Sequence, residues 1–228
     1  MSAIELRDAS VRLGDQLALE AVRVDLDARR IAVIGSNGSG KSTFARLVGG
    51  LVGASSGSVR VEGLDPIKQA SALRRRVGFV FSNPDAQILM PTVAEDAAFS
   101  LRAERLPRAE VADRVRSALL DVGLGALADR SAHELSGGQK QLLALCGALI
   151  RRPSLLIADE PTAFLDARNS RMIADRLFAD ADRRLLLVTH DLALAARCDV
   201  ALLFIDGRLD EVGDPLQVID RYEASLSC

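Results

Sequence analysis

The stretch "RIAVIGSNGSGKSTFARLV" at residues 30–48 decides the fold. It opens with a short apolar run of the kind that forms a buried parallel strand, and it closes with the spacing of a helix. Between them, "GSNGSGKS" at 35–42 fits the pattern G-x-x-x-x-G-K-[ST], which requires this strand-before, helix-after context. The stretch therefore predicts a nucleotide-phosphate loop in an α/β core.

The residue types in this loop suit phosphate binding. Its glycines let the backbone wrap closely, so that successive N–H groups can point at phosphate oxygens. Lys41 adds a compact positive charge near the β and γ phosphates, and the following helix adds its positive end. Ser42 offers a hydroxyl to Mg²⁺, and Thr43 can hydrogen-bond further along the phosphates. The predicted nucleotide-binding residues are Gly35, Ser36, Asn37, Gly38, Ser39, Gly40, Lys41, Ser42 and Thr43.

Outside the loop, short apolar runs alternate with helical patterns. "PSLLIADEP", "RLLLVTH" and "VALLFIDGRL" follow residue 150, and alternation of strands with helices indicates a parallel α/β core. The start of the chain is β-rich, with "AIELRDASVRL" alternating and "GSVRVEGLD" typical of a strand and turn. From about 92 to 150 the spacing is helical. We expect a single domain over 1–228, with the α/β core at about 1–86 and 151–228 and a helical lobe at about 87–150.

Composition excludes several classes of protein. Apolar residues make up 49% and charged residues 26%, which is typical of a globular chain. The net charge of −2 argues against a general nucleic-acid binder, and the absence of Trp with a single Tyr argues against stacking platforms for single strands. Cys146, Cys198 and Cys228 lack metal-site spacing and are interpreted as free thiols. No apolar run approaches the roughly 20 residues of a membrane span, so a membrane role requires a partner.

Acidic residues and a histidine follow two other predicted strands. Asp159 and Glu160 end the buried run "LLIADE", where α/β proteins place their ligands. We expect Asp159 to hold Mg²⁺ and Glu160 to orient or deprotonate the attacking water. His190 ends "LLLVTH" and suits hydrogen bonding to a γ-phosphate or to that water. The other histidine, His133, is interpreted as structural or solvated.

Gln87 lies where the core gives way to the helical lobe. Its neutral amide can reach Mg²⁺ or the attacking water and then move with the lobe, so we assign it to the nucleotide and metal sites. This assignment depends on its position, because a glutamine by itself indicates nothing.

These features together resemble the ATP-binding-cassette ATPases. The resemblance covers nearly the whole chain and includes the phosphate loop, the segment around Gln87, "LSGGQ" at 135–139, "LLIADEP" and His190, in that order. It implies a P-loop NTPase core with an N-terminal antiparallel β subdomain and an inserted helical lobe, with ATP and Mg²⁺ as cofactors. In this family two cassettes meet head to tail. The motif residues Ser136, Gly137, Gly138 and Gln139 are then expected to contact nucleotide held by a partner subunit.

Two positions depart from the family pattern. Leu13 stands where an aromatic residue often stacks on adenine, so we expect apolar contact without stacking. The loop after Glu160 reads "PTAFLD", with Ala163 where serine is common. Asp166 is retained, and the resemblance assigns it to the nucleotide site and to communication between the two sites.

The segment "NPDAQILMPTVAEDAAF" at 83–99 is similar to the energy-coupling-factor (ECF) importers of vitamins and metal ions. There it borders the groove for coupling helices of a membrane subunit; alternatively, Ile88 and Leu89 belong to the lobe core. The compact C-terminus resembles the biotin-uptake type more than the cobalt or nickel type. The expected partners are a second cassette, identical or homologous, an integral membrane coupling subunit and a substrate-binding membrane subunit. We expect a peripheral location on the cytoplasmic face of the membrane and no nucleic acid.

Two other classes are considered. A soluble cassette protein of translation or DNA repair usually carries two cassettes or a long coiled-coil insertion, and neither pattern occurs here. A P-loop kinase or regulatory switch would not need "LSGGQ". A transport motor therefore fits the motifs best.

Overall fold

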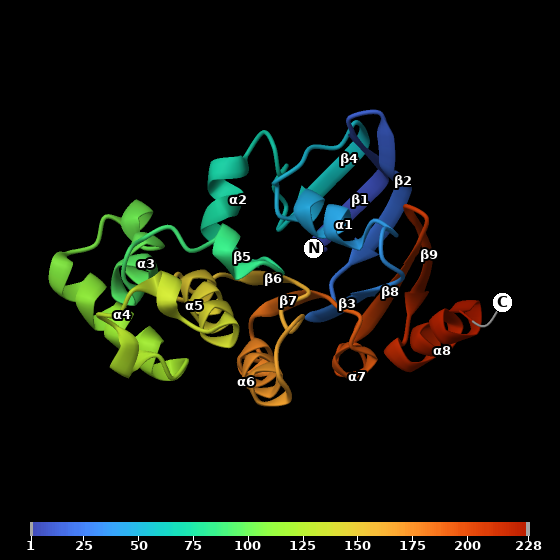
Figure 1. Cartoon of the computed structure of the whole chain (residues 1–228). Helices are drawn as coiled ribbons and strands as arrows, with labels where there is room; N and C mark the ends of the chain where they lie inside the picture. Colours follow the sequence, from blue (N-terminus) through green and yellow to red (C-terminus); the bar gives the residue numbers. More distant parts are fainter. Residues whose placement is uncertain (1, 227–228) are drawn as a thin grey trace.

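The computed structural model describes residues 2–226, and two sheets organise it (Figure 1). The smaller sheet has the order β2-β1-β4, and its neighbouring strands are antiparallel. Its strands are β1 (Ile4–Leu13), β2 (Gln16–Leu26) and β4 (Ser56–Val61). The expected N-terminal antiparallel β subdomain is thus confirmed. β1 and β2 meet in a tight hairpin in which Leu13 pairs with Gln16.

The larger sheet has six strands in the order β5-β6-β7-β3-β8-β9. They are β3 (Arg30–Ile34), β5 (Val77–Val80), β6 (Leu155–Asp159), β7 (Arg184–Val188), β8 (Val200–Ile205) and β9 (Arg208–Gly213). The first five run parallel, as the continuous apolar runs predicted, because parallel strands are covered on both faces. β9 returns antiparallel to β8 and was not separated from it in the sequence patterns.

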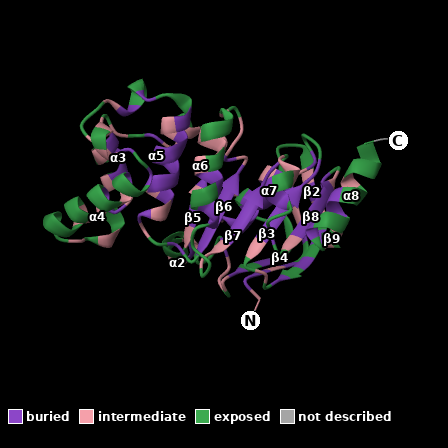
Figure 2. Ribbon diagram, turned by 90° about the horizontal axis from the view of Figure 1, so that it is seen from below, coloured by how far each residue is buried: buried purple, intermediate pink, exposed green. Residues whose placement is uncertain are grey.

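Side chains of the central strands alternate between two cores. On one face, Ile31 and Val33 of β3 pack with α1 (Lys41–Val48) and the small sheet. On the other, Ala32 and Ile34 pack with helices that cover the opposite side. These helices include α6 (Ala167–Phe178), α7 (Leu192–Ala195) and α8 (Pro215–Leu226). Figure 2 shows the buried strands between these exposed layers. The strands are therefore fixed from both sides, which makes their ends a firm support for a site.

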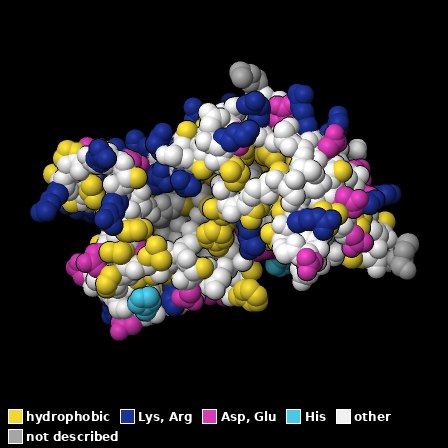
Figure 3. Space-filling view, turned by 90° about the horizontal axis from the view of Figure 1, so that it is seen from above, with side chains coloured by type: hydrophobic (Ala, Val, Ile, Leu, Met, Phe, Trp, Pro, Cys, Tyr) yellow, Lys and Arg dark blue, Asp and Glu magenta, His cyan; other side chains and the backbone are white. Residues whose placement is uncertain are grey.

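Between β5 and β6 the chain forms the expected helical lobe, which lies to one side of the sheets (Figure 1). After the short α2 (Ala70–Arg76) that precedes β5, the lobe contains α3 (Val93–Phe99), α4 (Arg108–Asp121) and α5 (Gly137–Leu149). Thr92 and Glu95 form a capping box that satisfies the first N–H groups of α3. On the face seen in Figure 3, a hollow separates the lobe from the rest of the chain. The predicted domain boundaries at 87 and 150 remain predictions.

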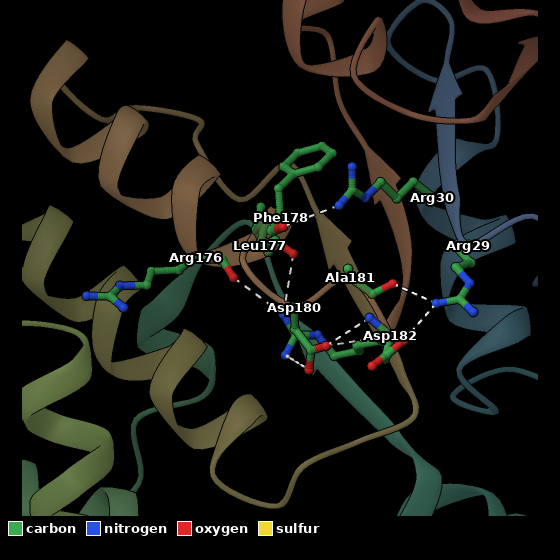
Figure 4. A network of polar contacts seen from close by, with 9 residues as sticks. Arg29, Arg30, Arg176, Leu177, Phe178, Asp180, Ala181 and Asp182 are labelled. Carbon is green, nitrogen blue, oxygen red and sulfur yellow. Dashed lines mark hydrogen bonds and ion pairs between the residues drawn. The ribbon is translucent and has the colours of Figure 1, made fainter.

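A polar network holds the loop after α6 against the start of β3 (Figure 4). Arg29 donates to the Ala181 carbonyl at 2.9 Å and to Asp182 at 3.0 Å. Arg183 donates to the carbonyls of residues 176 and 177, where α6 ends. Because the Arg29–Asp182 pair is exposed, its ion pair contributes about 1 kcal/mol or less. The pair joins the segments that precede β3 and β7, at the edge of the sheet opposite the candidate site.

Cys146 and Cys198 are buried and unpaired, which confirms the prediction of free thiols for them. Burial raises the pKa of each thiol to about 12, so neither is a thiolate at neutral pH. Cys228 lies outside the described residues. Within residues 2–226, no helix has both the length and the apolar character that a membrane span requires.

Candidate functional site

Three adjacent strands carry the predicted chemical groups at the same edge of the large sheet. The phosphate loop follows β3, Asp159 and Glu160 end β6, and His190 follows β7. β7 lies between β3 and β6, and all three strands are parallel. Their carboxyl ends therefore bring together three segments that lie far apart in the chain.

The phosphate loop folds around its own lysine. Gly40 precedes α1 with a φ of 101°, a left-handed conformation that favours glycine. Lys41 is buried, and its Nζ donates to the carbonyl oxygens of Gly35 and Ser36, each at 2.7 Å. Desolvation lowers the pKa of Lys41, although the negative charges of Glu160 and Asp159 partly offset this effect. The loop thus presents a desolvated ammonium group that an incoming phosphate would stabilise.

Ser42 and Asp159 form an oxygen pair beside this lysine. The Ser42 hydroxyl donates to Asp159 Oδ1 at 2.8 Å. Asp159 is only 2% exposed, and this burial raises the pKa of its carboxyl, against the lowering effects of Ser42, Arg46 and Lys41. A hydroxyl and a carboxylate are ligands that Mg²⁺ accepts together with phosphate oxygens and waters. The donor set therefore fits the predicted metal.

Glu160 and His190 are in direct contact. Oε2 of Glu160 accepts from the His190 backbone N–H at 3.3 Å and lies 2.7 Å from Nδ1 of the ring. The Glu160 backbone N–H donates to the Val188 carbonyl, and its φ is +50°, which is uncommon for a residue with a Cβ. Glu160 is thus held by β7 through both backbone and side chain. Such strain is typical of functional positions.

A pocket of about 500 Å³ lies over the phosphate loop. It is lined by Leu13, Gln16, Leu17, Ala18, Asn37, Gly38, Ser39, Gly40, Lys41, Ser42, Thr43, Glu160, Asp206 and Gly207. Leu13 and Leu17, at 44% and 38% exposed, form an aliphatic wall at the β1–β2 hairpin, and none of the described lining residues is aromatic. Gln16, Leu17, Ala18, Asp206 and Gly207 were not among the predicted site residues. Their only sequence signals are two hairpin turns, Gly14-Asp15 and Asp206-Gly207.

The "LSGGQ" motif lies on the lobe, at the start of α5. Ser136 is the N-cap, and it forms a capping box with Gln139. Ser136 and Gly137 are exposed, and no residue of the motif at 135–139 lines the phosphate-loop pocket. Gly137 instead borders a separate pocket of about 380 Å³, together with Phe164 and residues 82–85. The chain therefore does not bring its own motif to its own phosphate loop.

Other predicted residues occupy distinct positions. Both amide atoms of Gln87 bond to backbone: Oε1 accepts from Phe81 N–H at 2.7 Å, and Nε2 donates to the Phe79 carbonyl at 2.9 Å. Gln87 is thus not among the residues lining the phosphate-loop pocket. Asp166 is the N-cap of α6, and Asn169 N–H bonding lowers the pKa of its carboxyl. His133 is exposed, as a solvated histidine would be.

The segment at 88–89 divides between the two expected environments. Ile88 is 5% exposed and belongs to the lobe core, whereas Leu89 is 63% exposed. An apolar depression beside it is lined by Met90, Glu95, Ala98, Phe99, Leu101, Arg102, Arg105, Leu106 and Val111. The lobe-core alternative thus holds for Ile88, and Leu89 is left on the surface.

Comparisons with known proteins all identify ATP-binding proteins of transporters. Residues 19–163 match the family model described as "ABC transporter". The chain is 42% identical to the biotin transport ATP-binding protein BioM of Rhizobium etli, over 96% of this chain and 97% of that one. It is 43% identical to the energy-coupling factor transporter ATP-binding protein EcfA1 of Symbiobacterium thermophilum, over 92% of this chain and 76% of that one. The structure of cbiO1 from Clostridium perfringens, part of the ABC transporter complex cbiONQ, superposes with a TM-score of 0.84 at 30% identity, covering 98% and 92% of the two chains.

Proposed function

The chain belongs to the ABC transporter family as an ATP-hydrolysing subunit, and we propose that it powers an ECF-type importer, with biotin as the favoured solute. Family membership follows from the match over residues 19–163 and from relatives of about 40% identity.

The roles at the strand ends follow from their chemistry. The phosphate loop and Lys41 would bind the β and γ phosphates, since N–H groups and a desolvated ammonium converge there. Ser42 and Asp159 would hold Mg²⁺, which would supply charge neutralisation at the phosphates. Glu160 would orient and deprotonate the attacking water, and His190, hydrogen-bonded to it, would hold that carboxylate and reach the γ-phosphate. Gln87 would join this site only after leaving its bonds to residues 79 and 81.

One observation carries the proposed dimer: the "LSGGQ" motif and the phosphate loop line different pockets of the same chain. Ser136 and Gly137 are exposed at a helix N-terminus, where a hydroxyl and N–H groups can bind an anion. If the motif is to contact phosphate, the phosphate must come from a second cassette. One copy of each element per chain then gives two composite ATP sites per dimer. ATP would close the dimer, and hydrolysis would reopen it.

The importer type and solute are supported by relatives. One relative is named a biotin transport protein, another an energy-coupling factor protein, and one superposed structure is part of cbiONQ. We propose that Leu89 and the apolar depression next to it receive a helix of a membrane coupling subunit, which would place the protein on the cytoplasmic face of the membrane. A cobalt or nickel importer of the same type is the second candidate.

A mixed-dimer experiment tests the composite site. Lys41→Ala should lose ATP binding, and Ser136→Arg should keep ATP binding in the monomer but block hydrolysis. A dimer of one copy of each holds both defects in one site and leaves the other site intact. Mixing the two inactive variants should therefore restore hydrolysis and ATP-driven association. If the mixture neither hydrolyses ATP nor associates, the composite site is wrong.

The transport role is tested at the membrane. The chain should be purified from its native membrane with associated subunits, which mass spectrometry then identifies. Recovery of an integral membrane coupling subunit, lost on Leu89→Glu but retained on Leu216→Glu, is the expected result. Leu216 is an equally exposed leucine on α8, at 63%, and serves as the matched control. Recovery of no membrane protein with the wild type would contradict the transport role.

A further inference from the structure

The two glycines of the "LSGGQ" motif differ in their surroundings. A Cβ added at Gly137 meets no described atom within 4 Å, so nothing in the described chain requires glycine there. A Cβ added at Gly138 would lie 2.5 Å from both Cγ and Nδ2 of Asn169, closer than such atoms approach in proteins. The Asn169 side chain, from α6, therefore packs directly against α5, and a Cβ at position 138 would require that side chain to shift.

Asn169 also holds the loop that begins at Glu160. Its Nδ2 donates to Asp166 Oδ2 at 2.8 Å, and its backbone N–H donates to Oδ1 at 2.8 Å. Within the loop, Ala163 N–H donates to the Glu160 carbonyl at 3.1 Å. One half-buried amide thus contacts both the start of the motif helix and the end of the loop that carries Glu160.

This contact links different nucleotides in the proposed dimer. The start of α5 would serve the ATP bound to the partner, whereas Glu160 would serve the ATP bound to its own chain. On the basis of that proposed function, we propose that Asn169 is a positioning residue that couples the two ATP sites through one chain. When the motif engages the partner's nucleotide, the start of α5 bears on Asn169, and Asn169 moves Asp166 and its loop. The close contact at Gly138 and the two hydrogen bonds to Asp166 give this shift a continuous path from α5 to the loop.

Substitutions at Asn169 separate coupling from folding and from ATP binding. Asn169→Ala should leave the ATP dissociation constant and ATP-driven association unchanged, lower kcat about ten-fold, and remove cooperativity in ATP. Asn169→Asp keeps the volume but replaces the donor to Asp166 with a second carboxylate, so it should produce the same loss if the hydrogen bond matters. Arg171→Ala, an exposed change on the same helix, is the control and should have no effect.

A rescue experiment tests the packing contact itself. Gly138→Ala should lower kcat about a hundred-fold, because displacement of a positioned group by about 1 Å has effects of that size. Adding Asn169→Gly removes the clash and should restore at least about a tenth of wild-type kcat. Gly137→Ala is the matched control. A Cβ at position 137 does not clash with Asn169, so adding Asn169→Gly should not rescue that variant. Thermal unfolding of each full-length variant checks that it folds.

The outcomes are distinct. The proposal is supported if Asn169→Gly rescues Gly138→Ala but not Gly137→Ala, and if the Asn169 variants lose cooperativity in ATP. If wild type dimerises and hydrolyses ATP cooperatively while the Asn169 variants keep both kcat and cooperativity, only the Asn169 proposal is overturned. If wild type shows no ATP-driven dimer and no cooperativity, the proposed dimer fails, and the Asn169 proposal fails with it.

Discussion

Nδ1 of His190 lies 2.7 Å from Oε2 of Glu160, although 30 residues separate the two in the chain. The contact exists because β6 and β7 are parallel neighbours, so that the residues following them meet at one edge of the sheet. The same carboxylate oxygen accepts from the His190 backbone N–H. His190 is thus placed to act on the reaction through Glu160.

A double-mutant cycle measures this relationship. Glu160→Gln should keep ATP binding, slow phosphate release about a hundred-fold or more, and accumulate the ATP-bound dimer, because an amide cannot accept the proton. His190→Ala should also slow hydrolysis, and the double variant should lose less activity than the two single losses combined predict. Asp220→Asn, an exposed carboxylate on α8, is the control. Fully additive losses would mean that the two residues act independently.

Asp159 should lower the stability of the nucleotide-free protein. Its carboxyl pKa is raised by burial, so the folded state favours the protonated acid. Stability from the protonated acid is complete below the ordinary Asp pKa and is lost as pH rises through the raised value. At pH 7, Asp159→Asn should therefore unfold at a higher temperature than wild type, with a free energy of unfolding that is larger by about 1 kcal/mol.

The pH dependence checks this explanation. The stability difference between Asp159→Asn and wild type should disappear when thermal unfolding is measured below about pH 4, where the acid is neutral in both states. A difference that stayed constant down to that pH would have another cause. Hydrolysis by Asp159→Asn should be lost if the residue holds Mg²⁺.

Phe164 should contribute to association and not to folding. It is fully exposed, its φ is +63°, and it borders the same pocket as Gly137. An exposed aromatic in a conformation unfavourable for it gains nothing in the monomer, so a second copy should bury it. Phe164→Ala should leave the melting temperature unchanged and weaken ATP-driven dimerisation about ten-fold. Light scattering of the Glu160→Gln background measures this, and an unchanged dimer would exclude the assignment.

Leu13 should contact the base of the nucleotide. It lines the phosphate-loop pocket and remains 44% exposed, so a planar ring laid on it would cover apolar surface. Leu13→Ala should weaken ATP binding, and Leu13→Tyr should strengthen it about ten-fold, since stacking on an aromatic contributes about 1–3 kcal/mol per base. Calorimetric titration with ATP measures both, with Leu216→Tyr as the control. Equal affinities in all four proteins would remove Leu13 from the site.

Local order along the chain made the phosphate loop predictable. Strand, loop and helix are contiguous there, so the positions of Lys41 and Ser42 follow directly from the local sequence. The apolar runs likewise predicted β6, β7 and β8, because strands buried on both faces require continuous apolar sequence. Asp159 followed from the end of such a run.

Relations between distant segments were not predictable in this way. Nothing local specifies that β7 lies between β3 and β6, or that Asp206 reaches the pocket that Leu13 lines. The contact of Asn169 with Gly138 was not predicted because it depends on packing between α5 and α6, and asparagine near a helix start is ordinary. Gln87 was assigned to the nucleotide and metal sites from its position in the chain. In the structure its side-chain amide forms hydrogen bonds to the backbone of residues 79 and 81.

The adjacency of β6, β7 and β3 has a consequence for how such proteins diversify. The phosphate loop and the residues that follow β6 and β7 all extend from one sheet, whereas the surface assigned to the membrane subunit lies between β5 and β6, on α3 and its neighbouring segments. The two can change independently. Exchanging α3 for that of a relative should redirect the cassette to another membrane partner while the residues at the strand ends are retained.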